Sequence, residues 1–237
     1  MKQLLRSVLF SALALCSATV FAVDWTADPA TGCTAWNPNP QPGETITWSG
    51  ACVDGKASGE GTLAFVQNGS PTQTVSCSAF AEGVCSGKQK ITFADGTTHE
   101  GEAIKGSWQG KVVAIRPNGS RYEWQFVDGK REKKGMYASA DGHRYEGDFD
   151  GTNKRSGKGI YVWPDGDRYD GYWSDNTFQG YGERTLGGRT ERGLWVSGKL
   201  SRSCNSDNAC AEMKAEFAMP IANCKVNDVD INQEYRG

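Results

Sequence analysis

Two kinds of side chain alternate between residues 142 and 182, and this alternation is typical of β-strands. Tyr145, Gly147 and Phe149 stand at every second position, with acidic residues between them. The same alternation returns from Gly157 to Trp163. Because successive side chains of a strand point to opposite faces, the aromatic residues and glycines are expected to share one face of a sheet.

The segment Trp163–Gly166 contains a proline and an aspartate and predicts a tight turn after the second strand. Proline presets φ at the second position of such a turn, and glycine adopts positive φ without steric cost. The alternation then resumes from Tyr169 to Trp173. Two alternating runs joined by a turn predict a β-hairpin.

The glycines inside these strands lie on the aromatic face. Glycine in a strand interior usually weakens the strand and often marks a close approach by another group. A tyrosine or tryptophan from a neighbouring strand is therefore expected to cover the bare backbone, so that rings and gaps alternate along one face.

The pattern recurs along the chain with a nearly constant period. The first aromatic residue of each unit, or the residue in its place, recurs every 22 to 27 residues, at Trp48, Val75, His99, Tyr122, Tyr145, Tyr169 and Glu191. The turn pairs keep the same period, at Asn68-Gly69, Asp95-Gly96, Asn118-Gly119, Asp141-Gly142, Asp165-Gly166 and Gly187-Gly188. Two features with one period predict about seven stacked hairpins over residues 46–200, best at 142–184.

The segments on either side of the repeats have a different character. Residues 23–45 are rich in Pro, Asn and Thr and predict an irregular leader that covers the first strand. Residues 201–237 are expected to form a cysteine-containing cap. Within the cap, the apolar spacing from Asp207 to Ala218 predicts a short helix over the last strand, with Ser206 or Asp207 as its N-cap.

Residues 1–22 have the features of a signal peptide: two basic residues, an apolar stretch and a small-residue cleavage site. The apolar stretch is too short to span a bilayer as a helix. Cys16 resembles the acylated cysteine of a bacterial lipoprotein, but Leu15 stands where that signal has a small residue, which argues against an anchor. The chain is therefore expected to be exported, to the periplasm or beyond.

The cysteine content agrees with export, because seven of the eight cysteines follow the signal peptide. They are Cys33, Cys52, Cys77, Cys85, Cys204, Cys210 and Cys224. Their grouping suggests the pairs Cys33–Cys52 and Cys77–Cys85, while the last three would give one bridge and one leftover thiol. Their spacings match neither a zinc site nor a redox motif, so no metal and no cofactor is expected.

Composition excludes some partners. The chain has 30 glycines and 8 tryptophans, which indicate many turns and buried rings rather than disorder. The formal net charge is −2, and removing the two bases of the signal peptide makes it more negative. This balance argues against nucleic acid as a partner.

The motif Tyr-x-Gly-x-Trp/Phe, followed by Gly-x-Gly-x-Tyr/Trp and Asp-Gly, resembles the MORN repeat (membrane occupation and recognition nexus), specifically at the units beginning with Trp48, Tyr145 and Tyr169. The first of these looks like the opening unit of exported bacterial MORN proteins. The resemblance implies an all-β fold: an elongated single-layer antiparallel sheet of hairpins, here with a short C-terminal helical cap. It also implies a scaffold, dimerisation or membrane-associated role.

Two groups of residues are candidates for binding. The aromatic stripe could contact a glycan, a peptide or a lipid headgroup, or could simply pack: Tyr145, Phe149, Tyr161, Trp163, Tyr169 and Trp173. Basic clusters, expected in connections at one edge, could contact lipid phosphate or be solvated: Lys130-Arg131, Lys133-Lys134 and Lys154-Arg155-Lys158.

No catalytic motif is present in the sequence, and His99 and His143 stand at a strand position and in a turn. The sequence therefore predicts a protein that is not an enzyme and that binds another protein or itself. The alternative is binding of membrane lipid or envelope glycan through the aromatic face and basic loops.

Overall fold

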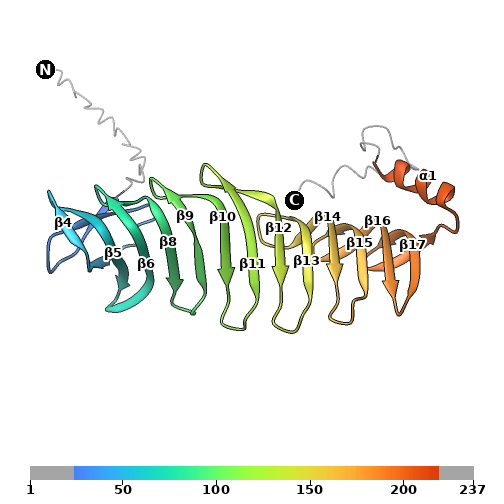
Figure 1. Cartoon of the computed structure of the whole chain (residues 1–237), viewed down its shortest axis with the longest axis horizontal. Helices are drawn as coiled ribbons and strands as arrows, with labels where there is room; N and C mark the ends of the chain where they lie inside the picture. Colours follow the sequence, from blue (N-terminus) through green and yellow to red (C-terminus); the bar gives the residue numbers. More distant parts are fainter. Residues whose placement is uncertain (1–23, 219–237) are drawn as a thin grey trace, which may run out of the picture.

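The structure is a computed structural model that describes residues 24–218 (Figure 1). The predicted signal peptide at residues 1–22 and the end of the predicted cap, with Cys224, lie outside the described residues. Within them, one 18-stranded sheet of consecutive hairpins is followed by a single helix. The predicted all-β sheet of hairpins with a C-terminal helix is confirmed.

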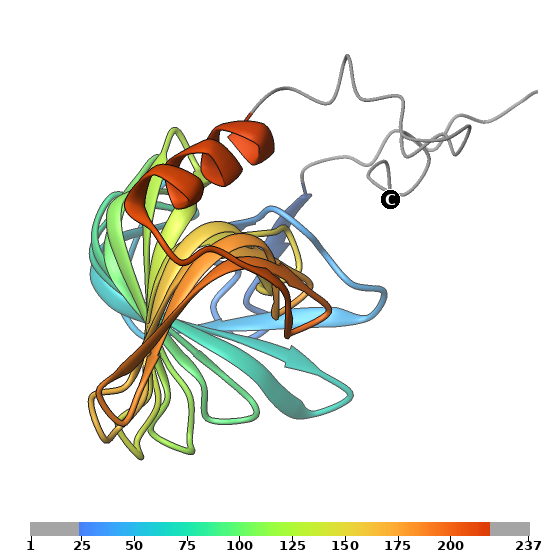
Figure 2. The same ribbon diagram turned by 90° about the vertical axis from the view of Figure 1, so that its right-hand side faces the viewer.

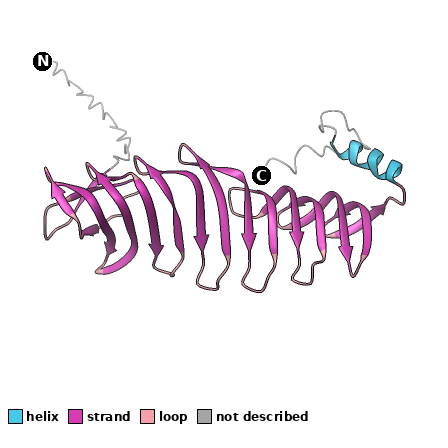
Figure 3. Cartoon of the chain, in the orientation of Figure 1, coloured by secondary structure: helices cyan, strands magenta, loops and turns pink. Residues whose placement is uncertain are grey.

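Strands cover most of the described chain (Figure 3). Their bounds are β1 (Asp24–Ala27), β2 (Thr34–Asn37), β3 (Glu44–Trp48), β4 (Ala51–Val53), β5 (Lys56–Gln67), β6 (Ser70–Ala81), β7 (Val84–Cys85), β8 (Gly87–Phe93), β9 (Thr98–Ile104), β10 (Ser107–Ile115), β11 (Arg121–Val127), β12 (Lys130–Ala138), β13 (Arg144–Phe149), β14 (Arg155–Val162), β15 (Arg168–Ser174), β16 (Thr177–Leu186), β17 (Arg189–Val196) and β18 (Lys199–Ser203). The helix is α1 (Asp207–Ala218).

From β8 to β18 each strand pairs antiparallel with the next strand along the chain. The strands therefore run across the long axis of the molecule, and the chain advances along that axis by one hairpin at a time (Figure 1). Parallel pairing occurs between β2 and β5, where Thr34 lies opposite Lys56.

The hairpins of the sheet use two main types of turn. In the first, both central residues have positive φ, as in Asp128 (φ 50) and Gly129 (φ 74) at one edge and in Asn68 (φ 52) and Gly69 (φ 78) at the other, which is the two-residue hairpin turn that matches strand twist. At the other edge Trp163 accepts a hydrogen bond from Gly166 N–H at 3.0 Å and donates its own N–H to Asp167 at 2.9 Å. This second type is the tight turn that the proline–aspartate–glycine segment predicted.

Most hairpins of the repeat region contain a register shift, as between Gly147 and Phe149 and between Gly171 and Trp173. An extra residue in one strand bends it and increases its twist. Figure 2, which looks along the long axis, shows that the strands are bent and the sheet is strongly curved across its width.

The leader is more regular than expected. β1 and β2 pair antiparallel, with Trp25 opposite Trp36, instead of forming an irregular segment. Cys33 and Ala35 are fully buried in one cluster with Leu63, Phe65 and other apolar residues of the sheet. Burial alternates along Thr34–Asn37, but the sequence Thr-Ala-Trp-Asn does not alternate between polar and apolar residues, so it gave no strand signal.

The helix forms where it was predicted, and Ser206 caps it: its Oγ accepts a hydrogen bond from Ala209 N–H at 3.2 Å. Cys210 and Met213 pack against Tyr181 of β16. The helix therefore covers the face of β16 and β17, whereas it was expected to lie over the last strand. Its contact with β18 includes an ion pair between Arg202 and Glu216 at 2.6 Å.

Candidate binding faces of the sheet

A line of glycines crosses six consecutive strands, β12 to β17. The register places them opposite one another in the order Gly135, Gly147, Gly159, Gly171, Gly182 and Gly193. A parallel line of tyrosines lies two residues away on the same face, in the order Tyr122, Tyr137, Tyr145, Tyr161 and Tyr169. The sequence repeat therefore places its glycines and its tyrosines in two parallel lines across the sheet.

The tyrosine rings cover the glycines. A Cβ atom built on Gly159 or Gly147 would overlap Tyr145, and one built on Gly171 or Gly182 would overlap Tyr169. Tyr145 O–H also donates to the carbonyl of Asp148 at 2.8 Å. Rings from neighbouring strands therefore fill the gaps that the glycines leave, as predicted.

Tryptophans complete this packing. The indole Nε1–H of Trp173 donates to the carbonyl of Gly159 at 3.0 Å, and that of Trp195 donates to the carbonyl of Gly182 at 3.0 Å. Tyr145 and Trp173 meet edge to face, with ring centroids 5.3 Å apart. Such pairs add stability beyond the area that they bury.

Four of the six residues proposed as an aromatic binding face belong to this core. Tyr145, Phe149, Tyr169 and Trp173 are between 0% and 4% exposed, so they pack and do not present a surface. Burial also raises the pKa of the Tyr145 and Tyr169 hydroxyls. Tyr161 and Trp163 are only partly buried and could touch a ligand.

Lys154 lies in the connection before β14, as predicted, but the other basic residues of the clusters lie within strands, because β12 begins at Lys130 and β14 begins at Arg155. The Arg131 guanidinium stacks over Trp124 at 5.2 Å, and that of Arg155 stacks over Trp173 at 4.6 Å. Lys154 forms an ion pair with Asp175. The arginines of the predicted lipid-contact edge are therefore occupied by the protein itself.

The two histidines take part in packing. His99 occupies the tyrosine line's position in β9, opposite Ala114, and meets Phe93 edge to face at 5.0 Å. Burial lowers the pKa of His99. His143 Nδ1 and the Tyr161 hydroxyl form a hydrogen bond of 2.8 Å, a contact that the sequence did not reveal.

The opposite face of the sheet carries three lines of charge, called the charged face below. Their members recur every 23 or 24 residues, which is every second strand: an arginine line (Arg121, Arg144, Arg168), an acidic line (Glu100, Glu123, Glu146, Asp170) and a lysine line (Lys88, Lys111, Lys134, Lys158). Apolar residues separate the acids along their line: Val113, Met136 and Ile160. Strands lie about 4.8 Å apart, so the motif repeats roughly every 10 Å.

Part of this charge is paired internally. Glu123 pairs with Lys111 and with Arg121, and these contacts lower the pKa of Glu123. Among residues 24–218, by contrast, Lys134, Arg144, Glu146 and Lys158 form no ion pair. Met136, which is 48% exposed, lies opposite Glu146 and two residues from Lys134, with Arg144 on the next strand and Lys158 on the strand after it. The middle of the charged face therefore offers unpaired charge beside an exposed apolar side chain.

The MORN repeat model matches residues 122–144, 145–168 and 169–187. Residues 122–187 carry three MORN repeats. Their first residues, Tyr122, Tyr145 and Tyr169, are members of the tyrosine line, so the family pattern and the ring packing describe the same units. A search of curated proteins finds no match to the chain.

MORN repeats are a non-enzymatic repeat family generally associated with protein or membrane binding. The described segment 24–218 contains no cluster of His, Cys, Asp and Glu suited to a metal ion. Over the same residues, the single helix is not of the length and apolarity needed to cross a membrane.

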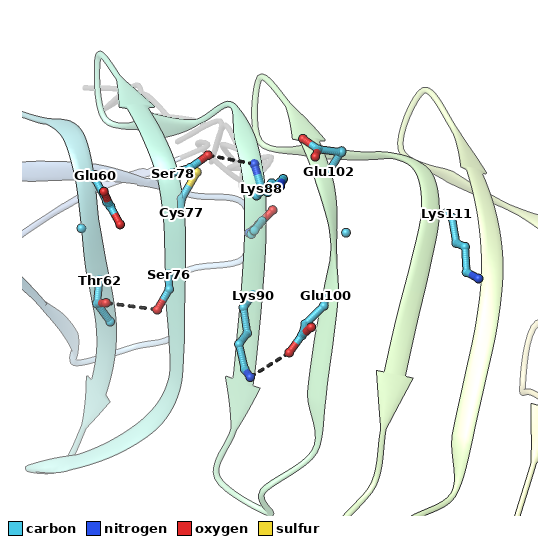
Figure 4. A pocket seen from close by; sticks show the side chains of 13 residues that line it. Glu60, Thr62, Ser76, Cys77, Ser78, Lys88, Lys90, Glu100, Glu102 and Lys111 are labelled. Carbon is cyan, nitrogen blue, oxygen red and sulfur yellow. Dashed lines mark hydrogen bonds and ion pairs between the residues drawn. The ribbon is translucent and has the colours of Figure 1, made fainter.

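The charged face is hollowed beside the MORN repeats, over β5 to β10 (Figure 4). This hollow measures about 740 Å³. Its lining includes Lys90 and Glu100, which form an ion pair of 2.7 Å, and Thr62 and Ser76, whose hydroxyls lie 3.1 Å apart. The alternating charges at residues 88–90 and 100–102 were the signal in the sequence that could have indicated it.

Helix α1 limits the charged face at the other end of the sheet. Three apolar or aromatic residues near the helix lie on this face: Tyr172, Tyr181 and Leu194. Each is next in sequence to a residue of the glycine line, and neighbouring residues of a strand point to opposite faces. Tyr181 and Leu194 pack with the helix, and Phe217 meets Tyr172 at 4.7 Å between ring centroids. The open part of the face therefore lies between the N-terminal end and β15.

Three disulfides hold the ends of the described chain: Cys33–Cys52, Cys77–Cys85 and Cys204–Cys210. The first two are the pairs that the grouping of cysteines suggested. Disulfides are compatible with an oxidising, exported location.

Proposed function

We propose that this chain is a non-catalytic, exported scaffold that binds another protein through its charged face. The observation that carries the proposal is the set of three charge lines, which repeat roughly every 10 Å along the sheet. A regular pattern of opposite charges steers encounter and selects one register of a partner. Unpaired charges around Met136 are free to make such contacts.

The charged face has the composition of a recognition surface. It combines fixed charges with Met136 and Ile160, and a strand scaffold holds each side chain at a set spacing. Met and Arg are enriched at protein interfaces. A partner with its own repeated charges would match several units at once, so weak contacts would add through multivalency.

Binding of membrane lipid or envelope glycan through Tyr161, Trp163 and the basic residues is the alternative. It has less support, because most of the aromatic stripe is buried and Arg131 and Arg155 stack on tryptophans. Self-association through the charged face is a special case of the proposal.

Capture from a cell-envelope extract tests the proposal. Immobilised wild-type protein is compared with the double variant Lys134→Glu, Lys158→Glu and with a control of equal charge change, Lys130→Glu, Lys199→Glu, in which both lysines follow turns at one edge. We expect one specific protein to be retained by the wild type and the control and to be lost from the charged-face variant. Equal retention by both variants, or no retained protein and a strict monomer, would contradict the proposal.

Sedimentation with anionic vesicles and with peptidoglycan tests the alternative in the same samples. Binding that is abolished by Trp163→Ala but unaffected by the lysine variants would favour lipid or glycan binding.

A further inference from the structure

A second hollow lies on the aromatic side of the sheet, where the leader meets the first repeats. It measures about 350 Å³. Leu63 of β5, Val75 of β6 and Ile91 of β8 line it from the sheet. Trp36 of β2 and Trp108 of β10 line it from the sides, and both are only partly buried. No charged residue lines this hollow, in contrast to the charged face.

Backbone forms a further part of the wall. Gly83, Gly106 and Gly129, one from each of three successive turns, line the hollow and have positive φ of 80, 78 and 74°. Gly106 N–H donates to the carbonyl of Cys85 at 2.8 Å, and Gly129 N–H donates to that of Trp108 at 3.1 Å. A Cβ atom on Gly106 would overlap the ring of Trp36, and one on Gly83 would overlap that of Trp25, so glycine at these turns lets the tryptophans of the leader pack directly on the backbone.

Covalent and hydrogen bonds hold the walls in place. The Cys33–Cys52 disulfide anchors β2 to the first hairpin, and Cys77–Cys85 joins two strands beside the hollow. Trp36 N–H donates to the carbonyl of Gly83 at 2.9 Å, which ties the leader to the first of the turns. The hollow is therefore a preformed site between a fixed leader and a fixed sheet.

Two side-chain amides supply the polar groups of the wall. Gln73 and Gln89 both line the hollow and are half-buried, and neither amide forms a hydrogen bond with another side chain or backbone group of residues 24–218. Neither is among the buried polar atoms that lack a partner in these residues, so both amides remain open to water. A ligand with one hydrogen-bonding group can take the place of that water.

We propose that this hollow binds a small, uncharged, mainly apolar molecule. Ligand sites commonly occupy a few hundred Å³, with apolar and aromatic walls and a few polar groups that orient the ligand. A cavity of about 150 Å³ holds one benzene ring, so this one has room for roughly twice as many atoms. A charged ligand is disfavoured, because it would lose its hydration without meeting an opposite charge.

Calorimetric titration of the full, oxidised chain with 1-naphthol, a neutral two-ring probe with one hydroxyl, tests the proposal. We expect saturable binding at one site, with quenching of tryptophan emission. 2-Naphthalenesulfonate, which has a similar ring system and a negative charge, should bind at least about tenfold more weakly.

Ser107→Trp locates the site, because Ser107 is an exposed lining residue whose enlargement fills the hollow without removing a wall. Thr177→Trp is the control, since Thr177 is also exposed and also begins a strand after a turn. Loss of 1-naphthol binding in Ser107→Trp but not in Thr177→Trp supports the proposal. Where Ser107→Trp fails to fold, Gln89→Lys provides the second variant, and it should lower the affinity for 1-naphthol and raise that for the sulfonate.

Three outcomes would overturn the inference: no saturable binding to the wild type, equal binding by Ser107→Trp when folded, or equal affinity for the neutral and the charged probe. If the wild type does not bind 1-naphthol and Ser107→Trp changes the oligomeric state, the inference is also overturned. The hollow would then be assigned to a side chain from a second copy of the chain. None of these results depends on the partner of the charged face.

Discussion

Glycine and tyrosine define this protein at the scale of single residues. Each glycine of the line from Gly135 to Gly182 leaves a gap, and a ring from the same or the adjoining strand occupies it. The sequence predicted this relation from alternation alone, because Tyr, Gly and Phe share a face at period two. It did not separate packing rings from exposed ones, since that distinction depends on the strand bend and on which rings meet across it.

Gly159→Ala is expected to destabilise the protein by about 1 to 3 kcal/mol, because a methyl group there would overlap the ring of Tyr145. Gly151→Ala is the matched control: it lies in the turn between the same two strands, and a Cβ atom there would meet nothing within 4 Å. Unfolding in urea measures the free energy of unfolding of both variants. Equal stability of the two variants would contradict the packing of the Tyr145 ring over Gly159.

His99 is expected to make stability fall in mild acid. Burial lowers its pKa from the usual 6.5, so below about pH 6.5 the unfolded chain takes up a proton that the folded chain resists, and stability is lost as pH falls toward the folded-state value. His99→Tyr places the residue of the tyrosine line at this position and removes the effect. Thermal unfolding of both proteins between about pH 7.5 and about pH 5 should show the wild type losing stability relative to the variant. If the stability of the two proteins changed with pH in the same way, the proposed role of His99 would be contradicted.

At the scale of elements, turn chemistry was the most predictive signal. Asp-Gly and Asn-Gly pairs marked the hairpins at one edge, and Ser206 was one of two proposed caps of α1. The position of that helix was not predictable, because its apolar residues indicate that it packs but not on which surface. Leader strands β1 and β2 were missed because each has only four residues.

Ser206→Ala is expected to loosen α1 by about 1 kcal/mol, because the Ala209 amide loses its capping acceptor. Amide hydrogen exchange should be faster in the first turn of α1 and unchanged in β13 to β15. Ser203→Ala, an exposed change in β18, serves as the control. Unchanged exchange throughout α1 would show that the cap does not stabilise the helix.

At the scale of the whole molecule, one period explains both faces. The 23- or 24-residue repeat lines up glycines and rings on one side and charges on the other, so the core and the proposed recognition surface arise from the same alternation. The repeat was predictable from the sequence. The two hollows were not, because each combines residues from several strands, and the smaller one also needs the leader.

Small-angle X-ray scattering of the full chain tests the central claim, that the repeats form one extended sheet. β3 and β4 share the place beside β5, and β7 and β8 share the place beside β6. With strands about 4.8 Å apart, the run from β3 to β18 is therefore expected to give a maximum dimension of at least roughly 60 Å and an asymmetric distance distribution. A compact globule of this length would have a radius of gyration of about 18 Å. A symmetric distribution with that radius would contradict the extended sheet, and with it both binding faces.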